Sequence, residues 1–214
     1  ADMRSKGPAG LTFDRLWHGQ CQPFIDAPTA HGFAPHPVPR ADVGWNWPKY
    51  SFWYSLLGNM ALQEPEAQAI LIDTGECYFP VAMLMFVKHY RYLPDSRRKA
   101  SFGWFLSVAP SAVFEYHEGK GNFGLTLDSM PRRLGQILID SLLVESENRG
   151  WDGRMGLHAD PAGEDELIDY YRNLPLHQLP KEARIGGLRN NDGGYFYSDE
   201  LNSMSLMEKW DPNR

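Results

Sequence analysis

The sequence has little of what marks several large classes of protein. Among its 214 residues only two are cysteines, Cys21 and Cys77, which lie far apart and outside any metal-binding spacing. We interpret both as free thiols, typical of a reducing compartment rather than of a disulfide-stabilised secreted domain. The longest nearly unbroken apolar stretch covers residues 79–87, far short of the roughly 20 residues that cross a bilayer. We therefore expect a cytoplasmic protein without a membrane-spanning segment.

An excess of positive charge is also missing. The chain has 21 basic and 27 acidic side chains, which gives a formal charge of -6. It therefore lacks the positive field that draws proteins onto phosphate backbones, and composition gives no support to a nucleic-acid partner. The rest is ordinary, with 43% hydrophobic and 22% charged residues, in a chain long enough to bury a core without disulfides or metals. One domain with an elaborated end is the simplest interpretation.

The first part of the chain is rich in proline, which fixes φ and removes backbone donors. These prolines are Pro23, Pro28, Pro35, Pro37, Pro39 and Pro48. The sequence therefore predicts an irregular N-terminal arm with a first strand over residues 1–48. The main domain is predicted over residues 49–214.

A helix with an aromatic face is predicted after the arm. Apolar residues recur there at helical spacing, Pro48 suits a first turn, and Pro65 marks the end. The residues of this face and of the aromatic cluster before it are Trp45, Trp47, Tyr50, Phe52, Trp53, Tyr54, Leu56, Leu57, Met60 and Ala61. Core packing is the favoured interpretation of the cluster, and an aromatic wall of a substrate pocket is the alternative.

Strands and helices then alternate in a way that favours an α/β fold. The predicted strands cover residues 69–73, 79–89, 101–108, 123–128 and 154–159, the first two joined by a turn at 74–76. Helices are predicted over residues 132–148 and 164–173, and a final hairpin over 194–209. A strand, helix, strand, helix order implies a crossover and a parallel pair within a mixed sheet.

Residues 119–124 match the pattern G-x-G-x-x-G, which can bring a backbone close to a pyrophosphate. That motif requires a preceding strand and a helix immediately after it. Here a strand-like segment and Pro131 follow instead, so a glycine-rich turn is favoured. A nucleotide-dependent enzyme remains the alternative.

Metal and nucleophile motifs are scarce. His158 and Asp160 put two possible ligands on one strand face, but no third ligand is evident. The sequence contains no H-E-x-x-H, C-x-x-C or G-x-S-x-G pattern. We predict no metal site.

The start of the predicted helix at residues 130–137 is a candidate anion site. First-turn amides have no partner within a helix and lie at the positive end of its dipole, so a phosphate binds there readily. Arg132 and Arg133 would add charge-assisted hydrogen bonds. An exposed helix start with two solvated arginines is the alternative.

The order of segments from this helix onward resembles the GNAT superfamily, the general-control-related N-acetyltransferases. Arg132 and Gly135 match the family's R-x-x-G-x-G/A turn, and Ile137 stands where that turn has Gly or Ala. Arg149 and Gly150 then match the pair that closes the helix, and Tyr171 matches the tyrosine of the next helix. The residues at 174–176 take the place of the family's L-G-F. The resemblance covers residues 69–209 and is strongest over 123–176.

The resemblance implies a GNAT-like α/β fold, with a mixed, mostly antiparallel sheet that is splayed at its centre and flanked by helices. It also implies acetyl-CoA as cosubstrate. In the favoured ungapped register, the backbone around Leu125 and Leu127 binds the pantetheine arm. The diphosphate contacts are then Arg132, Arg133, Leu134, Gly135, Gln136 and Ile137. In a second register, residues 106–110 face the cofactor and residues 111–130 form an insertion.

The implied activity is N-acetyltransferase, in which an amine attacks the thioester directly. Tyr171 would protonate the leaving thiolate, and Glu115 is the favoured general base, with Asp128 as alternative. The partner is an amine-bearing acceptor whose type stays open, and a homodimer is compatible with the sequence. A catalytically inactive CoA-binding or protein-interaction module is the alternative function, motivated by Ile137 and the long arm.

Overall fold

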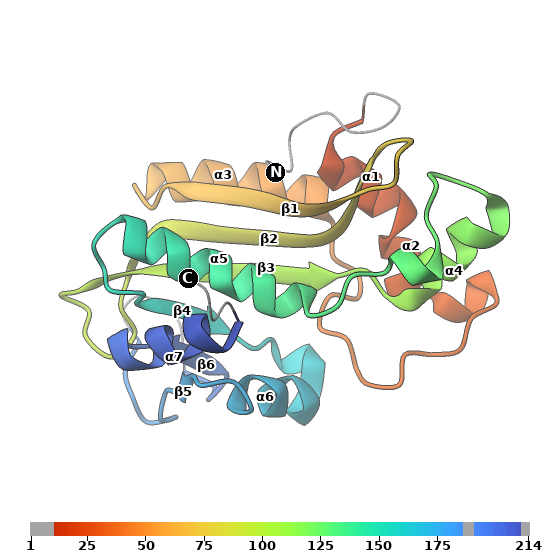
Figure 1. Cartoon of the computed structure of the whole chain (residues 1–214). Coiled ribbons are helices and arrows are strands. Elements are labelled where there is room, and N and C mark those ends of the chain that lie inside the picture. Colours follow the sequence, from red (N-terminus) through yellow and green to blue (C-terminus); the bar gives the residue numbers. More distant parts are fainter. Residues whose placement is uncertain (1–10, 186–190, 211–214) are drawn as a thin grey trace.

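The computed structural model, which describes residues 11–185 and 191–210, contains an open six-stranded sheet (Figure 1). The strand order is β1-β2-β3-β4-β6-β5. The strands are β1 (Pro65–Asp73), β2 (Tyr78–Arg91), β3 (Lys99–Val108), β4 (Met155–His158), β5 (His177–Gln178) and β6 (Tyr195–Ser198). β3 pairs with β4 in parallel, and the other pairs are antiparallel. This confirms the predicted α/β fold with a mixed, mostly antiparallel sheet.

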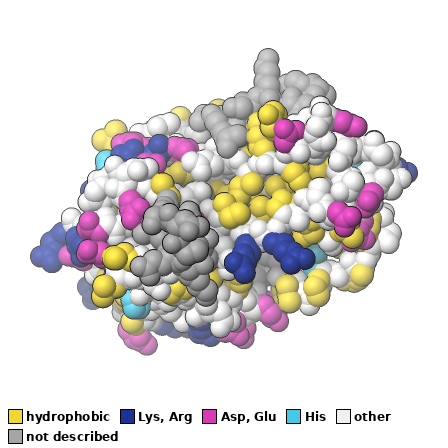
Figure 2. Space-filling model, in the orientation of Figure 1, with side chains coloured by type: hydrophobic (Ala, Val, Ile, Leu, Met, Phe, Trp, Pro, Cys, Tyr) yellow, Lys and Arg dark blue, Asp and Glu magenta, His cyan; other side chains and the backbone are white. Residues whose placement is uncertain are grey.

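Helices cover both faces of the sheet. They are α1 (Phe13–Gln20), α2 (Gln22–Asp26), α3 (Trp47–Met60), α4 (Ser111–Lys120), α5 (Leu134–Asn148), α6 (Glu164–Arg172) and α7 (Glu200–Trp210), with short 3₁₀ turns η2 (Pro28–His31), η3 (Leu127–Ser129) and η4 (Pro161–Gly163). In Figure 1, α5 crosses the front of β2 and β3, and α3 lies behind β1. Burial of one face of each helix against the sheet creates the core. In the same orientation, Figure 2 shows acidic and basic side chains scattered over this face of the molecule, with hydrophobic side chains exposed between them.

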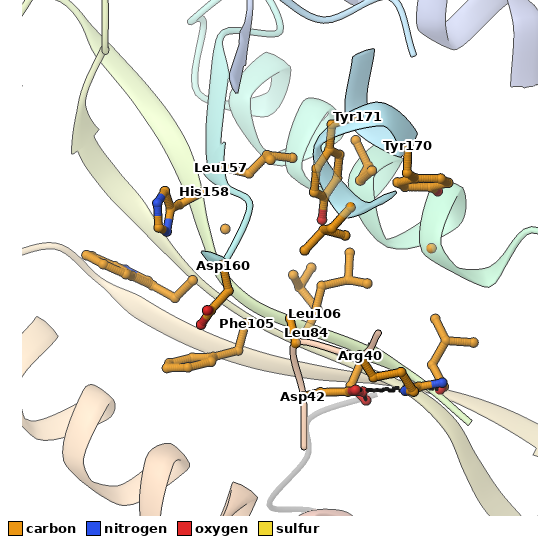
Figure 3. A pocket seen from close by; sticks show the side chains of 18 of the residues that line it. Arg40, Asp42, Leu84, Phe105, Leu106, Leu157, His158, Asp160, Tyr170 and Tyr171 are labelled. Carbon is orange, nitrogen blue, oxygen red and sulfur yellow. Dashed lines mark hydrogen bonds and ion pairs between the residues drawn. The ribbon is translucent and has the colours of Figure 1, made fainter. Parts of the chain in front are cut away.

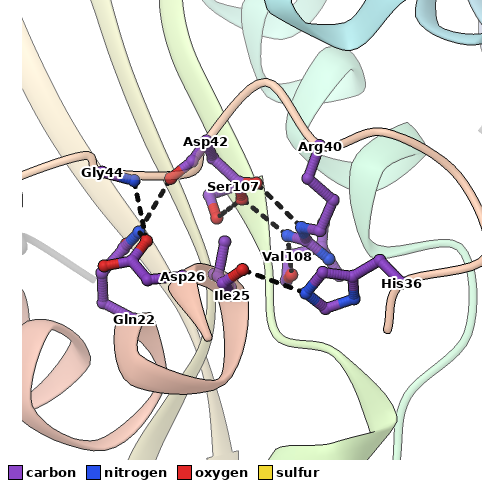
Figure 4. A network of polar contacts seen from close by, with 9 residues as sticks. All are labelled: Gln22, Ile25, Asp26, His36, Arg40, Asp42, Gly44, Ser107 and Val108. Carbon is purple, nitrogen blue, oxygen red and sulfur yellow. Dashed lines mark hydrogen bonds and ion pairs between the residues drawn. The ribbon is translucent and has the colours of Figure 1, made fainter. Parts of the chain in front are cut away.

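The N-terminal segment is more helical than predicted. Phe13, Leu16 and Trp17 lie at helical spacing on α1 and are all buried against the core. Among the described residues before α3 no strand element occurs, so the predicted first strand does not lie in residues 11–48, and residues 1–10 of the predicted arm lie outside the described residues. Residues 33–46 do form an irregular arm, which crosses the end of β3 (Figure 4).

The predicted strand at residues 123–128 is also wrong. Gly121, Phe123 and Gly124 all have positive φ, which an extended strand does not allow. The chain instead ends α4 with Gly121 in the left-handed region, and Thr126 and Ser129 then cap η3 reciprocally. The glycine-rich residues 119–124 are therefore the end of a helix and a turn. The last strand before α5 is β3, which favours the second register over the ungapped one.

The C-terminal segment forms β6 followed by α7 rather than the predicted hairpin. The side chain of Asp199 accepts a hydrogen bond from the Asn202 amide at 3.0 Å, as an N-cap does. This cap begins a helix where the sequence pattern predicted a turn. The hairpin formed by β1 and β2 and the helices α5 and α6 are confirmed.

The aromatic face of α3 is largely exposed, so core packing was the wrong interpretation for much of it. Phe52 is 61% exposed and Met60 is 74% exposed. Trp47 is fully buried, and Tyr50 stacks on Phe105 of β3 with ring centroids 4.9 Å apart. One side of α3 packs against the sheet and the other side is exposed, so the aromatic cluster is divided between core and surface.

His117 on α4 is buried among aromatic rings, and burial lowers its pKa below the ordinary value. The unfolded chain therefore binds a proton more readily than the folded protein. The neutral, buried His117 imidazole therefore stabilises the fold fully above about pH 6.5, and this stabilisation is lost as the pH falls below that value. We expect the urea midpoint to fall between about pH 7.5 and pH 5.5, and His117→Phe to reduce this fall. An equally steep fall in the variant would contradict this assignment.

Candidate functional site

A cavity opens where β3 and β4 diverge. Their parallel pairing covers residues 101–103 of β3 and 155–157 of β4. β3 then continues to Val108, whereas β4 ends at His158. The resulting cavity has a volume of about 360 Å³ and is lined by the arm, β2, β3, α5, β4 and α6 (Figure 3).

A bulge in β3 lies at the point of divergence. Phe86 of β2 pairs with Gly103 and Met85 pairs with Phe105, which leaves Trp104 as an extra residue. A bulge of this kind bends a strand and redirects its side chains. Trp104 and Phe105 both line the cavity.

The α5 side of the cavity combines apolar walls with two phenols. Gly135 of α5, Leu106 of β3, and Tyr170 and Tyr171 of α6 line it. The Tyr171 hydroxyl points into the cavity in Figure 3, and its ring packs on Phe196 with centroids 5.5 Å apart. Burial raises the pKa of both tyrosines, most strongly that of Tyr171, so that its hydroxyl keeps its proton at neutral pH.

Gly135 allows a close approach at the start of α5. A Cβ added there would lie 3.2 Å from the Tyr170 hydroxyl and 4.0 Å from Leu106. α5 itself begins at Leu134, after Arg133 in the left-handed conformation. The amides of its first turn are therefore beside the α5 side of the cavity, where they can serve as donors to an anion.

The opposite side of the cavity is more polar. Figure 3 shows His158, Asp160 and Phe105 on this side, away from the tyrosines. His158 Nε2 lies 2.9 Å from Asp192 Oδ2, and Asp160 accepts a hydrogen bond from the Ala162 amide at 2.9 Å. An imidazole and a carboxylate thus face the cavity from the end of β4.

Residues 39–42 of the arm line the cavity at the end of β3, and Figure 4 shows the polar contacts that hold this segment. The Arg40 guanidinium donates two hydrogen bonds to Asp42, at 2.8 and 2.6 Å, and a third to the Val108 carbonyl at 2.8 Å. The buried Asp42 carboxylate also accepts a hydrogen bond from the Ser107 hydroxyl. The arm is held to α2 by Gln22, which donates to the Asp42 carbonyl at 2.7 Å. Nothing in the proline-rich sequence of the arm indicated this network.

The predicted site residues are divided between the cavity and other places. Tyr171 and Gly135 line the cavity. Leu134 is buried and Gln136 is half-buried, whereas Arg132 and Arg133 are exposed at the start of α5. Ile137 is 48% exposed and does not line the cavity, so it leaves the space near Gly135 open.

The remaining predicted residues lie away from the cavity. Leu125 belongs to the core, and Leu127 is exposed on η3. Glu115 is exposed on α4, and Asp128 is exposed on η3. Neither candidate base therefore lines the cavity.

Within the described residues 11–185 and 191–210, no helix is long and apolar enough to span a bilayer. Within the same ranges, no group of three or more His, Cys, Asp or Glu side chains could hold a metal ion. Cys21 and Cys77 are both free thiols, as predicted.

Comparisons with known proteins concern the fold. No family model and no curated protein matches the sequence. An acetyltransferase of the GNAT family from Staphylococcus aureus Mu50 is 10% identical, with a TM-score of 0.46 over 87% of this chain and 94% of that one. AtaTR bound with acetyl-CoA is 12% identical, with a TM-score of 0.45 over 77% and 85% of the two chains. The KacTA–DNA complex is 12% identical, with a TM-score of 0.45 over 81% and 91%. These values carry no argument about activity.

Proposed function

We propose that this chain is an acyl-CoA-dependent N-acyltransferase, with acetyl-CoA as acyl donor and an amine as acceptor. The observation that carries the proposal is the cavity between the diverging strands β3 and β4, which has the start of α5 on one side and polar side chains on the other. Two substrates could enter from the two sides and meet between the strands. Holding reactants in this way is a large part of what an enzyme contributes to such a reaction.

The start of α5 is the proposed site of the cofactor diphosphate. Its first-turn amides supply donors, and the exposed Arg132 and Arg133 supply positive charge beside them. β4 does not pair with β3 beyond Gly103, so the backbone of residues 105–107 on that side is available to the pantetheine arm. Leu106 and Gly135 border this path.

Tyr171 is the proposed general acid. Its hydroxyl points into the cavity and carries a proton at neutral pH. It can therefore give a proton to the thiolate that leaves when the C–S bond breaks. The amine attacks the thioester carbon directly, so the chain needs no nucleophile of its own.

Isothermal titration calorimetry with acetyl-CoA and with CoA tests the proposal, followed by a transfer assay over a panel of amines. Binding of both and transfer to an amine would support it. Absence of binding, or binding only at millimolar concentration, would contradict the proposed function. Binding without transfer would favour the catalytically inactive module.

The close approach at Gly135 gives a sharper prediction. Gly135→Leu should weaken acetyl-CoA binding at least about tenfold, equivalent to about 1.4 kcal/mol, because the new side chain would fill the space between α5, Leu106 and Tyr170. Gly119→Leu is the matched control, since a Cβ there meets nothing within 4 Å. Calorimetry on the two variants measures the difference. Equal affinities of the two variants for acetyl-CoA would contradict a cofactor site beside Gly135.

A further inference from the structure

His158 and Asp192 form a hydrogen-bonded pair at the polar side of the cavity. His158 Nε2 lies 2.9 Å from one carboxylate oxygen of Asp192 and 3.1 Å from the other. His158 itself is partly buried and lines the cavity, whereas Asp192 lies behind it in the segment before β6. The imidazole ring also packs on Tyr195, with ring centroids 4.3 Å apart. The imidazole is therefore held on one side by a carboxylate and on another by a ring.

The segment around Gly194 fixes this pair. The Gly194 amide donates to Asp192 Oδ1 at 2.9 Å, and its carbonyl accepts from the Ala159 amide at 2.8 Å. A Cβ at Gly194 would lie 2.6 Å from the Ala159 carbonyl and 3.1 Å from His158 Nε2, so only glycine allows the approach. Burial alone would raise the pKa of Asp192, but the hydrogen bonds from Gly194 and His158 outweigh it and the pKa is lowered. The carboxylate is therefore ionised at neutral pH.

An ionised carboxylate only accepts hydrogen bonds, so it fixes the tautomer of the ring. His158 Nε2 must carry the proton that is shared with Asp192, which leaves the lone pair on Nδ1. Among the described residues, the hydrogen bonds of this imidazole are those of Nε2 with Asp192. Nδ1 is then free to accept a proton from a bound molecule.

We propose that His158 is the general base that deprotonates the acceptor and that Asp192 is its positioning residue. This assignment rests on the proposed acyltransferase function. The acceptor is a primary amine with an aromatic or apolar body, bound between His158 and the walls formed by Phe105 and Trp45. All three residues line the cavity, and Asp160 adds a carboxylate that attracts the ammonium. Glu115 and Asp128, the bases suggested by the sequence, are exposed outside it.

In the proposed reaction the acceptor ammonium gives one proton to His158 Nδ1, and the freed lone pair forms a C–N bond with the thioester carbon. The C–S bond breaks, its electron pair goes to sulfur, and the thiolate takes a proton from Tyr171. The nitrogen loses its second proton as the amide forms, which restores the tyrosine. His158 releases the first proton to solvent.

Several ionisable groups lie around the imidazole. Asp192 contacts Nε2 and Tyr195 packs on the ring, while Asp160 and the ion pair of Arg40 and Asp42 line the same cavity. Tyr170 and Tyr171 line the cavity from α6. A general base gives a rate that falls at acid pH, because its protonated form cannot accept a proton from the amine.

The test compares two acceptors, phenethylamine and hydroxylamine, in acetyl transfer by the whole chain. Phenethylamine is an ammonium at neutral pH and needs a base, whereas hydroxylamine is already neutral. His158→Gln should lower kcat/KM for phenethylamine about 100-fold and should change that for hydroxylamine much less. Asp192→Asn should give a smaller loss and move the acid limb of the pH profile, since the tautomer is no longer fixed.

A second histidine pair, with its histidine on β5 at the far side of β6, supplies the matched control. His177 Nε2 lies 3.1 Å from Asp199 Oδ2, and the ring packs on Tyr197 at 5.1 Å, but His177 does not line the cavity. His177→Gln should therefore leave both acceptors and the pH profile unchanged. A circular dichroism melt of each variant identifies loss of fold.

The outcomes separate this proposal from the proposed function. Absence of acetyl-CoA binding to the wild-type chain overturns the function and with it the base. Binding and transfer that His158→Gln leaves intact, or reduces equally for the two acceptors, overturns the base alone. Binding without transfer to either amine overturns both the base and the assigned acceptor class. A loss confined to phenethylamine, with unchanged binding, supports the proposal.

Discussion

Replacing Tyr171 by phenylalanine is expected to lower kcat for acyl transfer by roughly 10²–10⁴-fold while the Kd for acetyl-CoA stays unchanged. The hydroxyl points into the cavity and carries its proton at neutral pH, so it can give that proton to the thiolate as negative charge develops on sulfur. The ring is buried against Phe196, and phenylalanine keeps that contact. Steady-state kinetics with calorimetry separate the two effects, since an interaction made only in the transition state lowers kcat without weakening binding.

Tyr170→Phe is the control for this prediction. Tyr170 is adjacent on α6 and also lines the cavity, but in Figure 3 its hydroxyl points away from that of Tyr171. We expect a much smaller effect on kcat from this variant. If kcat is unchanged in Tyr171→Phe, or falls equally in the two variants, Tyr171 is not the acid.

The second large effect concerns stability and the arm. Asp42→Ala should lower the free energy of unfolding by about 3 kcal/mol, because it leaves the partly buried Arg40 guanidinium without its charge partner. The carboxylate is 6% exposed and holds Arg40 by two hydrogen bonds, and Ser107 by a third. Urea unfolding measures the change as a lower midpoint at constant slope.

A pair at the surface is the control for the arm. Asp95 and Arg97 make a similar two-bond contact, at 3.0 and 3.2 Å, but Arg97 is 89% exposed. Exposed pairs contribute little, so Asp95→Ala should lower the urea midpoint far less than Asp42→Ala does. Equal shifts in the two variants would mean that burial of the arm contributes nothing to stability.

Much of the fold could be predicted because it depends on local patterns. The turn between β1 and β2 contains Gly75, whose φ of +80° suits glycine, and the amide of that glycine bonds to Asp73. α5 and α6 follow from apolar spacing and from the signals at their ends. Such features involve residues close in sequence, and the structure confirms them.

The errors arose where tertiary context decided the structure. Leu125 is apolar in a β-like run, but the positive φ of Phe123 and Gly124 prevents a strand and places the leucine in the core. The exposure of Phe52 on α3 could not be predicted either, since helical spacing does not say which side faces the sheet.

The candidate site was predicted only in part for the same reason. Tyr171 and Gly135 could be identified because a local motif contains each of them. Asp192 lies 34 residues after His158, and the arm residue Arg40 lies 68 residues before Val108, so no pattern within one segment relates the partners. Contacts of this kind are set by sheet order and by the path of the arm.

The hydrogen bond from Arg40 to Val108 also bears on strand pairing at this edge of β3. Beyond the divergence, β4 no longer pairs with residues 105–107 of β3. An open strand edge is a template for strand addition by another molecule. The guanidinium occupies the Val108 carbonyl at the end of this edge, and the proline-rich segment beside it has few amides to offer a neighbour. The same arm that borders the cavity thus shortens the length of β3 with which a foreign strand could pair.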